Sequence, residues 1–306
     1  MDLRQLRYFV TVVDMRGVRP ASRELYVTQP ALSRALRQLE VELGVRLLTR
    51  TPQGVDPTEA GLDFLAHARS ILASADAATD AMRDRARTRR GIRIGVVAGI
   101  LGAGELTAPI IQRFRDHEPG VDLALEDLSF CDQVGPLLAG RLDAALVRGP
   151  LDHPDLEVVP LASEPRMLLV GGGHELAGEA GVDVEDVLDQ PTLRIGAPDS
   201  WASFWYLDDE RGAANAHATL PVTTTIANMQ LNVASSNAVI TVPAAMARLA
   251  PNPLVRCLEL RGAPPSTIGV ARRRTDRRPE VDAFIGHAGR ATEDLIGLLP
   301  GGALIG

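Results

Sequence analysis

The sequence predicts a small helical unit at the N-terminus, one long connecting helix and a larger α/β region. Three patterns predict this order. Apolar residues recur at helical spacing in three short segments before residue 45, they recur every three or four residues from Leu65 to Met82, and β-rich runs alternate with helical patterns after residue 91. With 306 residues and 45% hydrophobic content, the chain can build more than one core.

The first two helices are predicted from caps and breaks. Asp2 and Gln5 fit a capping box, in which each side chain accepts a hydrogen bond from the other residue's backbone N–H. An apolar face follows as far as Val13. After a break at residues 16–17, Pro20 falls early in a short second helix, where its missing N–H and fixed φ are tolerated.

The third helix is predicted to begin at the cap Thr28 and to present two different faces. Its inward stripe contains Ala31, Leu32, Ala35, Leu36 and Leu39. Its outward face carries Gln29, Ser33 and Arg37 at intervals of four residues, with Arg34 and Gln38 beside them. Such side chains can hydrogen-bond base edges and phosphates, and a short polar helix after a compact helix and a tight turn fits the DNA major groove. An ordinary solvated helix face is the other interpretation.

The charge of the chain is unevenly distributed. The net charge of -7 argues against a polyanionic partner for the molecule as a whole. Residues 1–58, however, carry nine arginines and six acids, a balance of +3, which leaves -10 for the rest. All 32 basic residues are arginine. This asymmetry favours a nucleic-acid-binding N-terminus on an acidic body, although an excess of +3 is small.

The residues of the first helices resemble the LysR-type transcriptional regulator family. The matching segments follow the family's order and spacing without a gap: residues 6–9, 21–34, 38–40, 43–48, 50–51 and 58–61. The resemblance implies a winged helix-turn-helix DNA-binding domain over residues 1–58, with the end of the third helix and the wing in residues 41–58 and Gly54 at the wing tip. The residues expected to contact DNA are Thr28, Gln29, Pro30, Ser33, Arg34, Arg37, Gln38, Arg50 and Thr51. The sequence departs from the family pattern at Gln53 and Asp56, where members often carry basic residues, and at Pro20.

A long helix is predicted from Thr58 to about Met82, within a linker and hinge over residues 59–90. Its apolar seam has the spacing of a coiled coil, and the residues expected to dimerise are Leu65, Ala68, Leu72, Ala75 and Met82. A helix of this length spans roughly 37 Å, which is comparable to one turn of DNA and would hold two DNA-binding domains at half-site spacing. The alternative is that the seam packs on its own domain.

Residues 91–306 are expected to form an α/β effector-binding domain. The β-rich runs are residues 92–97, 121–125, 143–147, 167–170, 192–195, 239–242, 255–258 and 268–271, and the helical patterns are residues 106–114, 133–139 and 279–299. The resemblance implies two subdomains joined by two crossovers, with a cleft between them as in periplasmic binding proteins. Subdomain I comprises residues 91–163 and 268–306, and subdomain II comprises residues 164–267.

The cleft is expected to hold a small-molecule effector, because strand ends and helix N-termini present free backbone N–H groups there. The resemblance implies that its lining includes Gly99, Ile100, Leu101, Ser129, Phe130, Arg148, Thr225 and Asn228. Plainer interpretations are that Gly99 shapes a turn, Arg148 is solvated and Thr225 is only an N-cap. Residues 98–104 lack the Ser or Thr with which the family often binds an effector carboxylate. The effector is therefore expected to be less acidic, or to be bound through the backbone.

Patterns typical of enzymes and metal sites are missing from the sequence. Gly99, Gly102 and Gly104 have the wrong order for a dinucleotide motif, no G-x-S-x-G elbow occurs, and the six histidines lack the spacing of metal ligands. We therefore expect no enzymatic activity, cofactor or metal. Cys131 could act as a redox sensor, but a lone cysteine is more typical of packing. Without a signal peptide or an apolar spanning segment, the chain is expected in the cytoplasm, with no membrane partner.

The expected function is that of a sequence-specific DNA-binding transcriptional regulator whose DNA binding or bending is modulated by an effector in the cleft. The alternative is a DNA-binding repressor with a vestigial, non-sensing C-terminal domain, and an enzyme that uses the cleft is a distant third. The resemblance implies double-stranded DNA, a homodimer or homotetramer, and RNA polymerase as partners. The sequence does not identify the effector or the target genes.

Overall fold

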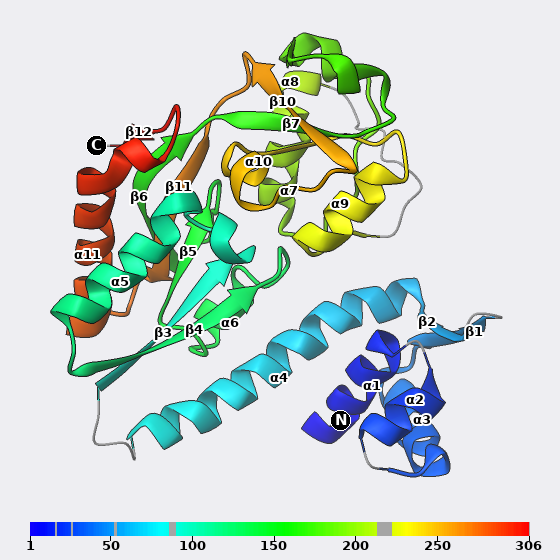
Figure 1. The fold of residues 1–306 in the computed structure, drawn as a ribbon. Helices are drawn as coiled ribbons and strands as arrows, with labels where there is room; N and C mark the ends of the chain where they lie inside the picture. The colour runs from blue at the N-terminus through cyan, green and yellow to red at the C-terminus, as the bar shows by residue number, and fades with distance from the viewer. Residues whose placement is uncertain (16, 26, 52–53, 86–89, 213–221, 306) are drawn as a thin grey trace. The chain divides into compact units, whose positions relative to one another are not determined.

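The computed structural model describes residues 1–305 apart from residues 16, 26, 52–53, 86–89 and 213–221, and it divides into two compact units (Figure 1). The first unit contains Met1–Arg83, and the second contains nearly all of the remaining chain. Among the described residues, no helix combines the length and the hydropathy that a transmembrane span needs.

The first unit consists of three short helices, a two-stranded wing and a long helix. Its elements are α1 (Leu3–Asp14), α2 (Val18–Glu24), α3 (Gln29–Leu43), β1 (Leu48–Thr51), β2 (Gly54–Pro57) and α4 (Glu59–Arg85). The predicted capping box opens α1, because Gln5 N donates to Asp2 Oδ1 at 2.7 Å and Asp2 N donates to Gln5 Oε1 at 2.9 Å. Thr28 occupies the N-cap position of α3, but the prediction that its side chain caps the helix is wrong, since it makes no capping hydrogen bond.

The core of the first unit forms where α1, α2, α3 and α4 meet. Its buried members are Leu6, Phe9, Val12, Ala21, Leu32, Leu36, Leu39, Leu47 and Ala68. Phe9 of α1 meets Phe64 of α4 with ring centroids 5.3 Å apart. The inward stripe of α3 is narrower than predicted, because Ala31 is exposed and Ala35 is half-buried. Ala31 lies about 100° around the helix from Leu32, and this rotation takes it off the buried side.

The wing is attached to α3 through a carboxylate. Glu40 Oε1 accepts hydrogen bonds from Leu47 N at 2.8 Å and from Leu48 N at 3.1 Å, which fixes the start of β1. The strands β1 and β2 pair antiparallel, and their last pair joins Thr51 to Gly54. Gly54 is therefore the first residue of β2, next to the connection at the end of the wing. The two residues that connect the strands lie outside the described part of the chain.

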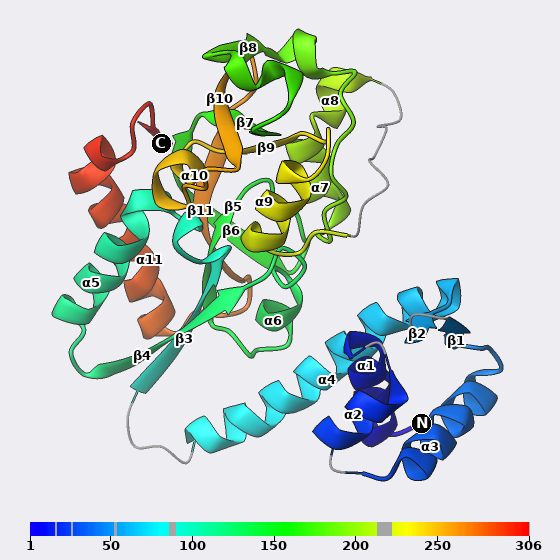
Figure 2. The same ribbon diagram turned by 45° about the vertical axis from the view of Figure 1, so that its right-hand side comes forward.

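The second unit contains two sheets, and we call the regions around them the first and second subdomains (Figure 2). The first subdomain holds a six-stranded sheet in the order β12-β6-β11-β5-β3-β4. These strands are β3 (Arg90–Val97), β4 (Val121–Leu128), β5 (Ala144–Arg148), β6 (Leu156–Glu164), β11 (Ser266–Arg273) and β12 (Ala303–Leu304). Helices α5 (Thr107–His117) and α11 (Pro279–Leu295) cover one face, and the short α6 (Gly135–Leu138) covers the other.

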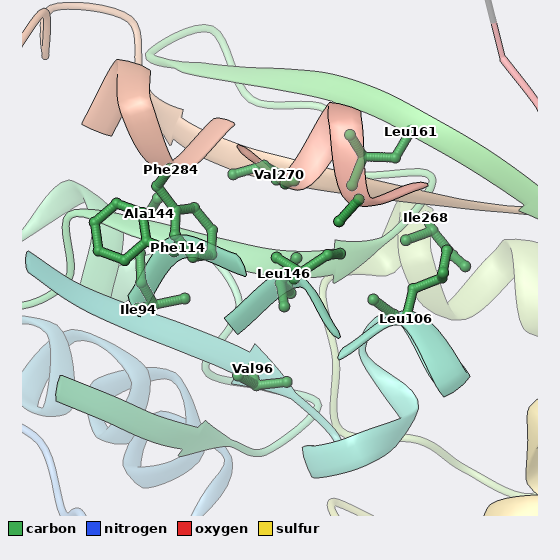
Figure 3. Packing of buried hydrophobic residues seen from close by; sticks show 14 of the residues in the cluster. Ile94, Val96, Leu106, Phe114, Ala144, Leu146, Leu161, Ile268, Val270 and Phe284 are labelled. Atoms are coloured by element: carbon green, nitrogen blue, oxygen red, sulfur yellow. The ribbon is translucent and has the colours of Figure 1, made fainter. Parts of the chain in front are cut away.

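The main core of the first subdomain lies between its sheet and the helices α5 and α11 (Figure 3). Phe114 of α5 packs edge-on against Phe284 of α11, with ring centroids 5.4 Å apart. Ile94, Leu146 and Val270, from three neighbouring strands, complete this layer. Because β11 lies inside the sheet, residues near the C-terminus complete a core that begins at β3.

The second subdomain holds a four-stranded sheet in the order β8-β10-β7-β9. Its strands are β7 (Arg166–Gly171), β8 (Gly181–Asp183), β9 (Ile240–Pro243) and β10 (Val255–Arg261). Its helices are α7 (Asp199–Tyr206), α8 (Asp208–Arg211), α9 (Ile226–Ala234) and α10 (Ala245–Leu249). The chain passes between the subdomains twice, from β6 to β7 and from β10 to β11.

Several elements of the second unit differ from the prediction. Residues 192–195 form two isolated bridges, to Val239 and to Thr223, instead of a strand. The last helix ends at Leu295 instead of residue 299, and a 3-10 turn follows it. Strands β6, β8 and β12 were not predicted. In β6 the reason is Pro160, which lacks a donor and lies where the pairing with β11 shifts register.

Candidate nucleic-acid interface and ligand cleft

The polar face of α3 is exposed along its length. Its exposed members are Thr28, Gln29, Pro30, Arg34, Arg37 and Gln38. Ser33 is half-buried, and Leu32, Leu36 and Leu39 are buried on the opposite side. The core therefore holds the apolar side of α3, while the side chains predicted to contact DNA point away from it.

A groove of about 1160 Å³ lies between α3 and the wing. Ser33 and Arg37 of α3 line it together with Arg46 and with Thr49 of β1. Glu40 also lines the groove, but one of its carboxylate oxygens already accepts two backbone N–H groups. Two exposed guanidinium groups beside a hydroxyl are the donors that phosphates and base edges require. The groove thus joins part of the predicted α3 face to the wing on one surface.

Two other predicted residues on α3 already have partners within the chain. Gln38 Nε2 donates to Glu42 Oε1 at 3.1 Å. Hydrogen bonds from the N-terminal amine and from Gln38 lower the pKa of the Glu42 carboxyl. Arg34 Nε donates to a backbone carbonyl one turn earlier, at 3.3 Å. Ser33 and Arg37, which line the groove, are therefore the stronger candidates for base contacts.

The residues of the predicted dimerisation seam on α4 have two different environments. Leu65, Ala68 and Leu72 pack against the core of the first unit, and Ala68 is fully buried there. This favours packing on its own domain for the first half of the seam. Ala75 is half-buried beyond that core. The side chains of three predicted site residues lie outside the described part of the structure: Arg50, Thr51 and Met82.

The cleft between the two subdomains narrows to a cavity of about 30 Å³. The carboxyl ends of β3 and β5 reach it from the first subdomain, and α7, α9 and β9 reach it from the second. Of the predicted effector residues, Leu101, Phe130 and Arg148 line the cavity, together with Trp201, Trp205 and Met229. This volume suits one or two water molecules, whereas small-molecule pockets usually have roughly 300–1,000 Å³.

Five predicted effector residues lie outside the cavity lining: Gly99, Ile100, Ser129, Thr225 and Asn228. Gly99 has a φ of 58° and shapes the turn after β3. Ser129 Oγ donates to Asp132 Oδ2 at 2.7 Å. Thr225 Oγ1 accepts from Asn228 N at 3.3 Å and caps α9. Local hydrogen bonds within the loops therefore occupy Ser129 and Thr225.

Arg148 is buried, so the alternative of a solvated side chain is wrong. Its Nε donates to Leu101 O at 2.6 Å, its Nη1 donates to Ser266 Oγ at 3.1 Å, and its Nη2 lies 2.6 Å from Glu164 Oε2. Burial lowers the pKa of the Arg148 guanidinium, and the charge of Glu164 opposes this shift. Because Glu164 and Ser266 belong to the two crossovers, Arg148 is bound to the hinge instead of being free to hold an anion.

Hydrogen bonds beside the cavity join the two subdomains directly. Phe130 N in the first subdomain donates to Thr224 O in the second at 3.0 Å. Trp201 Nε1 on α7 donates to Arg148 O at 2.8 Å. Both bonds lie beside the cavity, so they must break if the subdomains separate there.

A row of alternating charges also crosses the cleft. Arg248 of α10 forms an ion pair with Glu105 and lies 3.1 Å from Glu164 Oε1, while Glu164 pairs with Arg148. Burial raises the pKa of the Glu105 carboxyl, but hydrogen bonds, chiefly to Arg248, and the charges of Arg248 and Arg148 together outweigh burial and leave this pKa below its ordinary value. These two arginines and two glutamates balance each other in charge.

Sequence reasoning missed the aromatic wall of the cavity. Trp201 and Trp205 are the chain's two tryptophans, and both lie in α7. Their spacing of four residues places them on one helix face, and this pattern could have identified them. Trp205 Nε1 is buried and has no hydrogen-bond partner among the described residues.

Comparison with known proteins identifies both units. Residues 3–62 match the model described as bacterial regulatory helix-turn-helix protein, lysR family, and residues 85–293 match the LysR substrate binding domain. The HTH-type transcriptional regulator AlsR of Bacillus subtilis is 33% identical over 210 residues, 68% of each chain. The uncharacterized HTH-type transcriptional regulator YnfL of Escherichia coli is 30% identical over 224 residues, 73% of this chain and 74% of YnfL.

The fold is also similar to the crystal structure of full-length BenM. That match has a TM-score of 0.54 and 26% identity, and it covers 96% of this chain and 97% of BenM. The expected fold class is thereby confirmed: a winged helix-turn-helix followed by an α/β domain of two subdomains. The matches span the DNA-binding and the substrate-binding parts in the same order, so the chain belongs to the LysR family of transcriptional regulators.

Proposed function

We propose that this regulator reads DNA with the exposed face of α3 and senses a small molecule in the cleft of its second unit. The observation that carries the first part is the groove beside α3. It brings Ser33 and Arg37 to the same surface as Arg46 and the wing. A surface of this kind can place a helix in the major groove while the wing contacts the backbone.

Within this interface, we assign two kinds of contact. Ser33 and Arg37 contact base edges and provide sequence preference, whereas Arg34, Arg46 and Arg50 contact phosphates and provide affinity. The phosphate contacts make binding weaken steeply as salt increases. Of the other predicted residues, Thr28, Gln29 and Pro30 lie at the start of α3, where backbone N–H groups also suit a phosphate, while Gln38 and Thr51 are given no separate role.

For the assembly, we propose a homodimer that uses α4 beyond Leu72, with a homotetramer as the larger form. Leu65 and Ala68 already pack within the domain, which leaves the later part of α4 for a second chain. RNA polymerase is the proposed partner of the DNA-bound form.

The proposed compartment is the cytoplasm, where bacterial DNA lies.

Two readings of the cleft remain. Its position at the carboxyl ends of parallel strands supports effector binding. Its volume of about 30 Å³ favours, as a second candidate, a repressor whose C-terminal domain does not sense. Addition of candidate metabolites to a DNA footprint separates the two, because only a sensor changes its footprint.

The DNA-binding proposal is tested with Ser33→Ala in the full-length protein. We expect a loss of about 1–3 kcal/mol in preference for the upstream region of its own gene, with binding to random duplex unchanged, because one base contact is removed. Gel retardation on both duplexes measures this. Ser70→Ala is the matched control, since Ser70 is exposed on α4 and does not line the groove.

Two outcomes would contradict this proposal. Equal losses on specific and random DNA would remove Ser33 from the base contacts. If the unaltered protein retarded no upstream fragment even at low ionic strength, DNA recognition by the α3 face would be overturned as a whole.

A further inference from the structure

One wall of the cleft cavity consists of packed aromatic rings. Phe130 lies against Trp201 with centroids 5.5 Å apart and an interplanar angle of 32°, and Trp201 lies against Trp205 at 5.4 Å. All three side chains are buried. Leu101 and Met229 add further apolar surface. Aromatic surfaces of this kind favour ring systems, which gain area burial and offset or edge-to-face packing.

Trp205, which lines the cavity, carries a buried indole donor without a partner among the residues that the structure describes. Trp205 Nε1 is buried and makes no hydrogen bond within the described part of the chain. Trp201 Nε1, by contrast, donates to Arg148 O, and the hydroxyl of Thr241 donates to Trp205 O at 2.8 Å. An indole N–H can only donate, and a buried donor gains from any acceptor that reaches it. The matching ligand atom is therefore a hydrogen-bond acceptor.

The charges beside the cavity are already balanced. Arg148 is paired with Glu164, and Arg248 is paired with Glu105 and Glu164. An entering carboxylate would find both of these neighbouring cations already compensated. Burial of an anion without its own cation is costly, so the site favours an uncharged ligand.

We propose that the effector of this cleft is an uncharged aromatic molecule whose carbonyl or similar acceptor takes a hydrogen bond from Trp205 Nε1. The proposal rests on the sensing function proposed above. An aromatic ring exceeds the cavity volume of about 30 Å³. Binding therefore requires the subdomains to separate, which breaks the bonds from Phe130 N to Thr224 O and from Trp201 Nε1 to Arg148 O.

The ligand class is tested by fluorescence titration of the full-length protein. Trp201 and Trp205 are its only tryptophans, so the signal reports on the cavity alone. Three probes of similar size are compared: acetophenone, which is uncharged with an acceptor, benzoate, which is anionic, and α-methylstyrene, which lacks the acceptor. Acetophenone is expected to bind about tenfold more tightly than either of the others. Calorimetry checks each affinity independently of probe absorption.

Trp205→Phe isolates the role of the indole N–H. This variant keeps an aromatic ring, so we expect the affinity for acetophenone to fall about tenfold while that for α-methylstyrene stays unchanged. Trp201→Phe is the comparison variant, because separation of the subdomains also releases its N–H from Arg148 O, and it should alter the affinities for all three probes alike. A selective loss for acetophenone in Trp201→Phe would assign the donor to Trp201 and overturn the role of Trp205. Equal losses for all three probes in Trp205→Phe would overturn the assigned hydrogen bond.

Glu164→Gln tests the charge balance. The variant leaves Arg148 without its buried anion, so benzoate should gain affinity relative to acetophenone, and circular dichroism verifies that the variant is folded. In the unaltered protein, binding of benzoate at least as tight as that of acetophenone, or no saturable binding of acetophenone up to about 5 mM, would overturn the ligand class.

These measurements are made without DNA, so they are independent of regulation. If the probes bind in the expected order but leave the DNA footprint unchanged, sensing fails and the ligand class stands. If the footprint responds to benzoate and not to acetophenone, sensing stands and the ligand class fails.

Discussion

Arg148 follows a predicted strand of the α/β region, and its position at the cleft was expected from the sequence. The hydrogen-bond and ion-pair partners of Arg148 were not expected. Leu101, Glu164 and Ser266 are distant along the chain and come together only when the sheet forms. The same limit applies to Trp201 and Trp205. Periodicity identifies the face of a helix, but it does not show which other segment covers that face.

Removal of the Arg148 side chain is expected to destabilise the second unit. Arg148→Ala leaves the buried Glu164 with only the more exposed Arg248, so we expect the free energy of unfolding to fall by about 3–5 kcal/mol. Urea denaturation followed by tryptophan fluorescence measures the change. Arg115→Ala, at an exposed position on α5, should stay within about 0.5 kcal/mol of the unaltered protein. If Arg148→Ala lowered the free energy of unfolding by a similarly small amount, the ion pair between Arg148 and Glu164 would contribute little to stability.

At the scale of elements, the junction between the wing and α4 depends on a close backbone approach. A Cβ atom at Gly61 would lie 2.0 Å from Leu47 O. Thr58 holds the junction from both sides, because its hydroxyl donates to Arg46 O at 2.7 Å and accepts from Gly61 N at 3.0 Å. Only glycine fits where the first turn of α4 meets the backbone before β1.

Gly61→Ala is therefore expected to lower the stability of the first unit. Alanine favours a helix by about 1 kcal/mol over glycine, but overpacking against backbone costs about 1–3 kcal/mol or more, and the clash outweighs the propensity. Thermal unfolding of the variant and its affinity for DNA test this. Gly289→Ala, inside α11 with nothing within 4 Å of the added carbon, should instead stabilise the second unit by about 0.5–1 kcal/mol. If Gly61→Ala left the stability of the first unit unchanged, the backbone around Leu47 would have to move aside without a measurable cost.

The helices of the first unit were more predictable than the shortest strands of the second. Helical spacing and the Asp2 cap predicted α1 and α3 nearly to their ends, because these signals are local. The two-residue β12 and the three-residue β8 are too short for a periodic pattern, and β6 is interrupted by Pro160. In these strands, pairing with neighbours determines the structure, and pairing is not a local property.

At the scale of the whole second unit, a few polar contacts decide whether the cleft opens. Arg248→Gln removes the cation between Glu105 and Glu164. We expect the Phe130 amide, which bonds to Thr224 O, to exchange its hydrogen about fivefold faster, because a partly exposed ion pair contributes only about 1 kcal/mol. Hydrogen exchange measured by mass spectrometry tests this, with the central strand β5 as an internal control. Equal acceleration in β5 would indicate general destabilisation instead of opening.

The same contact predicts a dependence on pH. The folded pKa of Glu105 lies below its ordinary value of 4.5, so its contribution is present above that value and is lost as pH falls through the lowered pKa. Protection of the Phe130 amide, corrected for intrinsic exchange, should therefore decrease in mildly to strongly acidic solution. Arg248→Gln should remove most of this dependence, and an identical profile in the variant would exclude the pair as its source.

The position of β11 between β5 and β6 has a consequence for synthesis on the ribosome. Helices α1 to α4 are complete by residue 85, whereas β11 ends only at Arg273. At about 5–20 residues per second, synthesis from Arg85 to Arg273 takes roughly ten seconds or more, and β5, which ends at Arg148, exposes an unpaired edge for about the last six seconds or more of this time. A ribosome that stops early in this interval therefore releases the helix-turn-helix unit without the second unit that follows it.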